Sequence, residues 1–156
     1  MTEIAPEPNL FSIEREPGPA AGRETAAHLA DEVAAEFGPR DESSFALAAR
    51  DAAGCRIGGI KGVIHWRWLY VAQFFVASSW RGRGLGRALL RQAEALAREK
   101  DCVGLYLDTF SPRAEKFYLA QGFTVAGRIE NFPPGAARIF LFKSLGQARD
   151  GAAKTS

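Results

Sequence analysis

Cysteine and histidine are scarce in this chain of 156 residues, which contains two of each. Cys55 and Cys102 form no CxxC pair, and a disulfide framework or a zinc site would need a second pair. We therefore expect two reduced and mostly buried thiols. His28 and His65 lie too far apart in the sequence to suggest a metal site, so a metal enzyme is not expected.

An excess of charge and long apolar runs are also lacking. Twenty Lys and Arg balance 18 Asp and Glu, which leaves a net charge of +2, too little to make the whole chain a polyanion binder. No run approaches the roughly 18 apolar residues of a membrane span. Residues 1–10 lack the basic and apolar regions of a secretory signal. These absences predict a cytoplasmic protein without a membrane span, and nucleic acid is not expected as a partner.

The length and the 47% hydrophobic content suit one globular domain with a buried core. Proline and glycine in residues 1–22 predict a partly flexible leader, with a short strand at Leu10 to Ile13. A single domain is expected from residue 23 to 145. Residues 146–156 are small and polar and predict a flexible tail.

Hydrophobic periodicity predicts alternating strands and helices within that domain. Helices are expected at 22–37, at 85–100 and between Ser111-Pro112 and Gly122; strands at 44–50, 55–65, 68–77, 102–108, 123–129 and 137–145. The aromatic and β-branched strand 68–77 is expected to be central. The order strand, helix, strand from 68 to 108 fits a parallel βαβ unit with a right-handed crossover.

The decisive segment follows the central strand and reads Arg81-Gly82-Arg83-Gly84-Leu85-Gly86-Arg87. Alternate glycines let the backbone bend tightly and leave its N–H groups open to a ligand. The start of the next helix adds unpaired N–H donors and the positive end of a dipole. The arginines, with Arg91 one turn later, can meet several phosphates. The loop therefore predicts a phosphate ligand.

The spacing of the glycines separates this loop from two common phosphate-binding motifs. A dinucleotide fingerprint needs GxGxxG and an acidic residue about 20 positions later, whereas this loop reads GxGxG. A Walker loop needs GxxxxGK followed by Ser or Thr, which the loop also lacks. A plain tight turn with solvated arginines remains as a structural alternative.

Arg81, Gly84 and Gly86, placed between a core strand and a helix, resemble the pyrophosphate loop of the GNAT superfamily of N-acetyltransferases. The resemblance spans about residues 44–145 and includes the segment 117–123, which is similar to the family's Tyr-x-x-x-Gly-Phe ending. It implies acetyl-CoA as the cofactor. It also implies an α/β fold: a mixed, twisted sheet of six to seven strands, with helices on both faces and the central parallel strands splayed. A homodimer is consistent with the resemblance.

The resemblance assigns two of the three services that acetyl transfer to an amine requires. Phe74, Phe75 and Val76 match a bulged strand whose backbone pairs with the cofactor, and an unpaired N–H there would polarise the acetyl carbonyl. Tyr118 matches the proton donor for the departing thiolate. Ser111 stands where many relatives carry an asparagine that contacts the cofactor. The implied cofactor contacts are Phe74, Phe75, Val76, Arg81, Gly82, Arg83, Gly84, Leu85, Gly86, Arg87 and Ser111.

The third service, deprotonation of the amine, has no clear candidate. Relatives often carry a carboxylate where this chain has Tyr70, Ala72 or Tyr106. Asp108 is the nearest carboxylate and is the candidate base, with His65 or a water molecule acting on a partly neutral amine as alternatives.

Four aromatic residues are candidates for the wall of the acceptor site, although core packing would account for them equally well. They are Trp66, Trp68, Tyr70 and Phe132. Such walls suit a hydrophobic or heteroaromatic amine.

The sequence therefore predicts an acetyl-CoA-dependent N-acetyltransferase that acts directly on a small-molecule amine in a ternary complex. The missing strand carboxylate leaves open a non-catalytic acyl-CoA sensor. Acetylation of a protein N-terminus or an aminoacyl-tRNA is a third hypothesis, although no separate basic stripe supports tRNA.

Overall fold

The computed structural model describes residues 10–146. The chain divides between Arg40 and Asp41 into two compact units, whereas a single domain that begins at residue 23 is expected from the sequence. Residues 1–9 of the expected leader and 147–156 of the expected tail lie outside the described residues. The strand expected at Leu10 to Ile13 is wrong, because these residues form no strand and no strand within residues 10–146 pairs with them. Within the described residues, no helix is long and apolar enough to cross a membrane.

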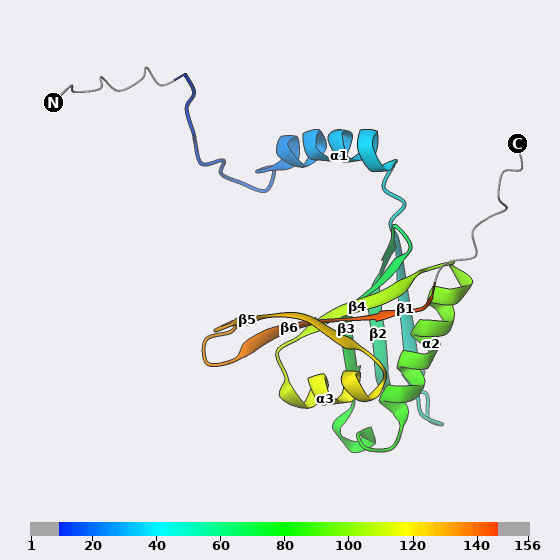
Figure 1. Ribbon diagram of the computed structural model, residues 1–156. Helices are drawn as coiled ribbons and strands as arrows, with labels where there is room; N and C mark the ends of the chain where they lie inside the picture. Colours follow the sequence, from blue (N-terminus) through cyan, green and yellow to red (C-terminus); the bar gives the residue numbers. More distant parts are fainter. Residues whose placement is uncertain (1–9, 147–156) are drawn as a thin grey trace, which may run out of the picture. The chain divides into compact units, whose positions relative to one another are not determined.

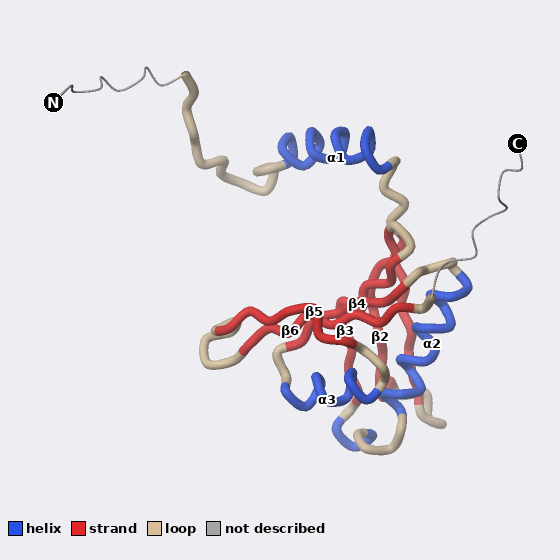
Figure 2. Tube along the Cα trace, in the orientation of Figure 1, coloured by secondary structure: helices blue, strands red, loops and turns tan. Residues whose placement is uncertain are grey.

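The first unit contains helix α1, Arg23–Phe37, which confirms the helix expected there (Figure 2). Gly22 precedes it with a φ of 75°, and its N–H donates to the Glu16 carboxylate at 2.7 Å. The helix ends at Gly38, whose φ of 88° turns the chain and whose N–H donates to the Ala34 carbonyl. None of its side chains is buried.

The second unit is a mixed six-stranded sheet with the strand order β1-β2-β3-β4-β6-β5 (Figure 1). Its strands are β1 Ser43–Arg50, β2 Arg56–His65, β3 Trp68–Val76, β4 Gly104–Thr109, β5 Thr124–Glu130 and β6 Ala137–Ser144. Only β3 and β4 pair in parallel, and all other neighbours are antiparallel. The mixed α/β sheet expected from the sequence is confirmed.

Two helices, α2 (Leu85–Glu99) and α3 (Pro112–Ala120), pack on one face of this sheet. Their buried side chains share a core with the strands: Leu69, Val71, Leu89, Leu90, Ala93, Ala97, Leu105, Leu107, Tyr118, Ile139 and Leu141. Helices on both faces were expected, but within residues 41–146 none lies on the opposite face. The reason is topological. Crossovers between parallel strands are right-handed as a rule, and both of these advance in the same direction across the sheet, which puts their helices on the same side.

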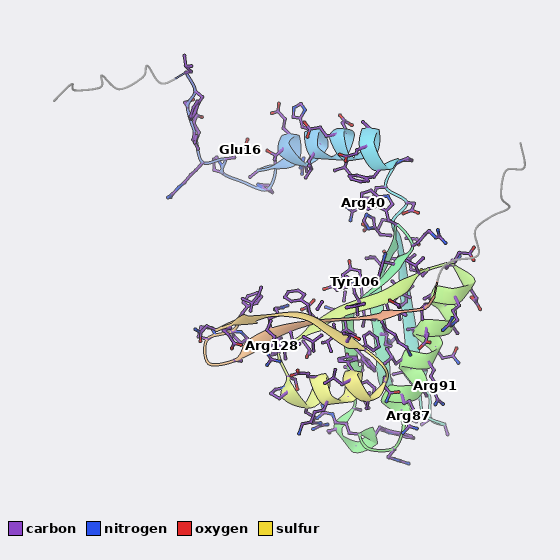
Figure 3. The ribbon with its side chains drawn as sticks, viewed as in Figure 1. Glu16, Arg40, Arg87, Arg91, Tyr106 and Arg128 are labelled. Carbon is purple, nitrogen blue, oxygen red and sulfur yellow. The ribbon has the colours of Figure 1, made fainter. Side chains whose placement is uncertain are left out.

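The face without helices carries aromatic and charged side chains. Along β4, Leu105 and Leu107 are buried in the core, so Tyr106 and Asp108 project to the other side. Figure 3 shows Tyr106 on the side of the sheet away from α3. Tyr106 is 41% exposed. This second face is therefore partly exposed to solvent and carries polar groups among aromatic side chains.

A bulge at Ala72 divides β3 into two halves. Lys61 of β2 is opposite Gln73, but the next residue, Gly62, is opposite Val71, so Ala72 is an extra residue. The core face consequently changes from Leu69 and Val71 to Phe74 and Val76. The bulge expected at residues 74–76 is therefore misplaced, since those residues pair regularly with β2.

The parallel strands β3 and β4 separate just after this point. Their pairing runs from Trp68 and Gly104 to Val71 and Leu107 and then stops, although β3 continues to Val76. The expected splay of the central strands is confirmed, and we call the space between the two strand ends the β3–β4 gap.

An ion pair ties α2 to β6 on the core side of the sheet. Glu94 accepts from Lys143 Nζ at 2.9 Å and from Arg98 Nη2 at 3.2 Å. Burial alone would raise the pKa of Glu94, but these two cations lower it below its usual range.

Glu94→Gln should therefore destabilise the protein mainly above pH 5. The lowered pKa means that the folded state binds fewer protons here than the unfolded state, so the contribution is lost as the pH falls through the folded pKa. We expect a loss of about 1 kcal/mol at pH 7 that shrinks toward pH 3, measured by urea unfolding of both proteins across this range. A difference that stays constant with pH would contradict this account.

Candidate cofactor and acceptor site

The glycine loop forms the start of α2. Gly82 and Gly84 have φ values of 72° and 86°, a left-handed backbone that favours glycine. Gly84 caps the helix without a side chain, and the first helical hydrogen bond runs from Ala88 N–H to the Gly84 carbonyl. The N–H groups of the three residues from 85 to 87 therefore have no acceptor within the described part of the chain. The predicted phosphate cradle has the backbone that anion binding requires.

The arginines of the loop divide into two kinds. Arg81 donates through Nε to the Val76 carbonyl at 3.2 Å, and the Arg83 guanidinium lies 4.1 Å from the Trp80 ring centre. Both contacts hold the loop. Arg87 lies beside the loop and Arg91 one turn further along α2, and neither is ion-paired within residues 10–146 (Figure 3). These two side chains remain open to a ligand of opposite charge.

The backbone of Phe74 and Val76 faces the β3–β4 gap. Ala77 N–H donates to the Ile57 carbonyl of β2, so the backbone groups of Ala77 and, by alternation, Phe75 point toward β2. Those of Phe74 and Val76 point the other way, where β4 no longer pairs. Phe75 differs from Phe74 and Val76, because its backbone faces β2 and its ring is 49% exposed.

Tyr118 lies on α3 within the core. Its ring contacts those of Phe74, Phe117 and Phe123, with centres 5.3 to 6.3 Å apart. Burial, together with the negative charge of Asp108, raises the pKa of Tyr118 to about 12. The hydroxyl is therefore neutral at physiological pH and can donate its proton.

Asp108 stands at the end of β4, immediately after the last residue paired with β3. Its Oδ1 accepts from the Tyr70 hydroxyl at 2.9 Å and its Oδ2 from Arg138 Nε at 2.7 Å. Burial and the hydrogen bond to Asp108 raise the pKa of Tyr70. The candidate base is therefore part of a Tyr70–Asp108–Arg138 cluster at the mouth of the gap.

The four predicted acceptor-wall residues separate in the structure. Tyr70 stacks on Tyr106 with ring centres 4.8 Å apart, and Trp68 meets the edge of Tyr106 at 6.3 Å. Phe132, in the turn between β5 and β6, lies under the Arg138 guanidinium at 4.6 Å. Trp66 is not brought to the cluster: it lies in the turn before β3, at the opposite end of that strand from the gap, and stacks on His65.

Ser111 is the N-cap of α3. Its Oγ accepts from Ala114 N–H at 3.2 Å, which is a stabilising role. The hydroxyl proton remains available as a donor, and the contact with a cofactor stays a prediction.

Sequence reasoning missed Arg138. Alternation along β6 places it on the open face of the sheet, opposite to the buried Ile139. Only the strand order reveals its position: β6 inserts between β4 and β5, which brings Arg138 to Asp108.

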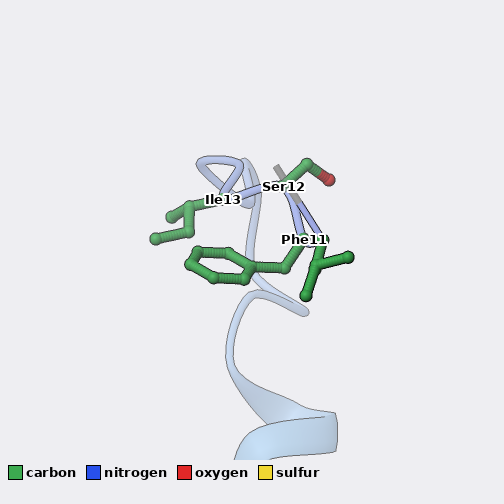
Figure 4. Close-up of a pocket in the computed structure, with 4 residues that line it drawn as sticks. Phe11, Ser12 and Ile13 are labelled. Carbon is green, nitrogen blue, oxygen red and sulfur yellow. The ribbon is translucent and has the colours of Figure 1, made fainter. Parts of the chain in front are cut away.

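Two hollows lie elsewhere. One is lined by the consecutive residues Leu10 to Ile13 of the first unit (Figure 4). The other, of about 460 Å³, lies beside α2 and the end of α3 and is lined in part by Arg91, Glu94 and Lys143. Apart from Arg91, no residue predicted for the site lines either hollow. The candidate site therefore consists of the glycine loop, the β3–β4 gap and the Tyr70–Asp108–Arg138 cluster.

Comparison with known proteins shows the family of this chain. The model of the acetyltransferase (GNAT) family matches residues 8–123. The chain is 37% identical to blasticidin-S acetyltransferase of Streptomyces morookaense over 102 residues, 65% of this chain and 75% of that one. It is 35% identical to an acetyltransferase of Agrobacterium fabrum over 109 residues, 70% of this chain and 80% of that one.

The fold of the solved structures agrees as well. A crystal structure of an acetyltransferase from Bacillus cereus superposes with a TM-score of 0.80 at 26% identity, covering 87% of this chain and 99% of that one. Because the family model matches residues 8–123, which are most of this chain, the chain belongs to the GNAT family of acetyltransferases and is an acyltransferase.

Proposed function

We propose that this enzyme transfers the acetyl group of acetyl-CoA directly to the amine of a small molecule within a ternary complex. The observation that carries the proposal is the β3–β4 gap beside the glycine loop. The backbone groups of Phe74 and the N–H of Val76 point into this gap, whereas the Val76 carbonyl already accepts from Arg81 Nε. The loop offers further N–H groups a short distance along the chain. An extended ligand with a diphosphate at one end and amides along its arm would form hydrogen bonds with both the loop N–H groups and the backbone groups that face the gap.

The residues present fit coenzyme A. Gly82 and Gly84 carry no side chain over the loop, and a Cβ added at either would meet no protein atom within 4 Å, so a ligand can approach the backbone there. The N–H groups from 85 to 87 would hold the diphosphate together with Arg87, and Phe74 and Val76 would hold the arm. When bound, acetyl-CoA supplies an activated acetyl group and a thiolate leaving group.

Two side chains on either side of the gap would manage the protons. Tyr118 donates its hydroxyl proton toward the sulfur, since its raised pKa keeps it neutral. Asp108 offers negative charge to the ammonium form of the acceptor. Its oxygens keep lone pairs beyond those used by Tyr70 and Arg138, so it can receive the amine proton directly or through water.

A small molecule is the acceptor that the relatives favour. One relative is named for the acetylation of blasticidin-S, and it is 37% identical to this chain. The exposed aromatic residues near the cluster, Tyr106 and Phe132, suit a ligand with apolar or ring surfaces.

The test is the release of free thiol from acetyl-CoA with a panel of amines. We expect release only when an amine is present, with intersecting double-reciprocal plots, because no covalent acetyl-enzyme is needed. Thiol release without acceptor and accumulation of acetylated protein would overturn direct transfer. Tight binding of acetyl-CoA without turnover on any amine would favour a sensor.

A further inference from the structure

Arg138 is held firmly at the edge of the candidate acceptor site. Its Nε donates to Asp108 at 2.7 Å, and its guanidinium lies 4.6 Å from the Phe132 ring centre and 5.8 Å from that of Phe110. The side chain is 29% exposed, so it is neither solvated freely nor fully enclosed. Three neighbours therefore fix the plane of the guanidinium.

Most of the hydrogen-bonding capacity of Arg138 is unused. A guanidinium has five N–H donors, and the bond from Nε to Asp108 uses one. The donors on the two Nη atoms have no acceptor within residues 10–146. A planar, fixed pair of N–H groups matches a carboxylate, which accepts two parallel hydrogen bonds. The arrangement thus has the form of a carboxylate-binding fork.

The charges of the cluster complement a ligand with two opposite charges. Asp108 is negative and stands where the β3–β4 gap opens, and Arg138 lies beside it on β6. An acceptor whose ammonium group approaches Asp108 would meet Arg138 with the next part of its structure. A carboxylate there would be attracted, whereas a second ammonium group would be repelled.

Resting on the proposed function, we infer that Arg138 binds a carboxylate of the acceptor, so that the substrate is an amine that also carries a carboxylate. Arg138 is then a specificity-determining residue. Asp108 has two tasks in this arrangement: it faces the amine and it orients Arg138 through Nε.

Matched pairs of acceptors test the inference. They are L-phenylalanine and its amide, 4-(aminomethyl)benzoic acid and its amide, and 6-aminohexanoic acid and its amide. In at least one pair, kcat/KM for the acid should exceed that for the amide by about 10- to 100-fold, the range for a charge-assisted bidentate contact. If the amide is acetylated with the same kcat/KM as the acid in all three pairs, the inference is overturned and the proposed function stands.

Two variants test whether Arg138 causes the preference for the acid over the amide. Arg138→Gln should reduce the ratio between the kcat/KM values for acid and amide to about 1. The ratio is the readout, because loss of the pair between Arg138 and Asp108 acts on the acid and the amide alike. Arg128→Gln is the matched control, since Arg128 on β5 is also paired with a carboxylate, Glu115 at 2.9 Å, and has no contact with the cluster. A ratio that persists in Arg138→Gln, or that falls equally in Arg128→Gln, would contradict the inference.

Binding provides a readout that does not depend on turnover. Calorimetry with coenzyme A present should show that wild type binds 4-(aminomethyl)benzoate at least about 10-fold more tightly than 4-(aminomethyl)benzamide, and that Arg138→Gln binds both equally. If no amine releases thiol, the proposed function fails and this comparison alone decides the inference. Equal binding of the two compounds by wild type would overturn it.

Discussion

Gly84→Val should weaken the binding of coenzyme A by about 100-fold. Two effects add: a branched side chain would cover the backbone that is expected to hold the diphosphate, and the φ of 86° at Gly84 is strained for valine, so the loop would shift. A Cβ at Gly84 meets no protein atom within 4 Å, so the fold itself should survive. Calorimetry with coenzyme A measures the affinity directly.

Gly54→Val is the matched control for this experiment. Gly54 lies in the β1–β2 turn with a φ of 83° and also has nothing within 4 Å of an added Cβ. The two variants should therefore lose similar stability, about 1–2 kcal/mol, from the left-handed conformation. Only the variant at Gly84 should lose affinity for coenzyme A. Equal affinity in both variants would refute the assignment of the loop.

Tyr118→Phe should lower kcat by about 100-fold and leave the affinity for coenzyme A nearly unchanged. The change removes the donor expected to protonate the thiolate, and such proton transfers contribute about 10²- to 10⁴-fold. The ring remains in place between Phe74 and Phe123, because phenylalanine keeps its packing. Stopped-time assays of thiol release at saturating acceptor give the rate.

Two controls accompany the change at Tyr118. Its hydroxyl has no hydrogen-bond partner within residues 10–146, so urea unfolding of Tyr118→Phe should show a stability within about 1 kcal/mol of wild type. Because the pKa of Tyr118 is about 12, the wild-type rate should not decline from loss of this proton below about pH 11. A variant with the wild-type rate, or a decline near pH 9 that the variant abolishes, would contradict the role.

Local signals in the sequence predicted the elements well. The glycine spacing and the amphipathic pattern of residues 85–99 reflect interactions within a few residues of each other, and the structure has a helix at Leu85–Glu99 that begins directly after Gly84. The Ser111 cap at the start of α3 is likewise local, and it is present. The resemblance to a family added the splay between the central strands, which no local pattern encodes.

What the sequence could not provide depends on distant parts of the chain. The Asp108–Arg138 pair joins residues 30 positions apart and exists because the last strand inserts beside β4. The same is true of the side occupied by the helices, since it follows from strand order. Trp66 lies close to Trp68 in the sequence, which favours a shared wall, but the turn at Trp66, with a φ of 46°, leads the chain away from the gap.

The extra residue in β3 has a consequence for anyone who engineers this enzyme. A combinatorial library of the strand must reserve apolar codons for positions 69 and 71 in its first half, but for 74 and 76 in its second. A library designed on regular alternation throughout the strand would assign position 74 to the outer face and position 75 to the core. Deleting the codon for position 72 would keep those four side chains inside, because they would then alternate regularly. The strand would lose its bulge, however, and the bulge lies next to the point where β3 separates from β4. Such a shortened enzyme could fold normally and still have no room for the coenzyme A that is proposed to bind between the strands.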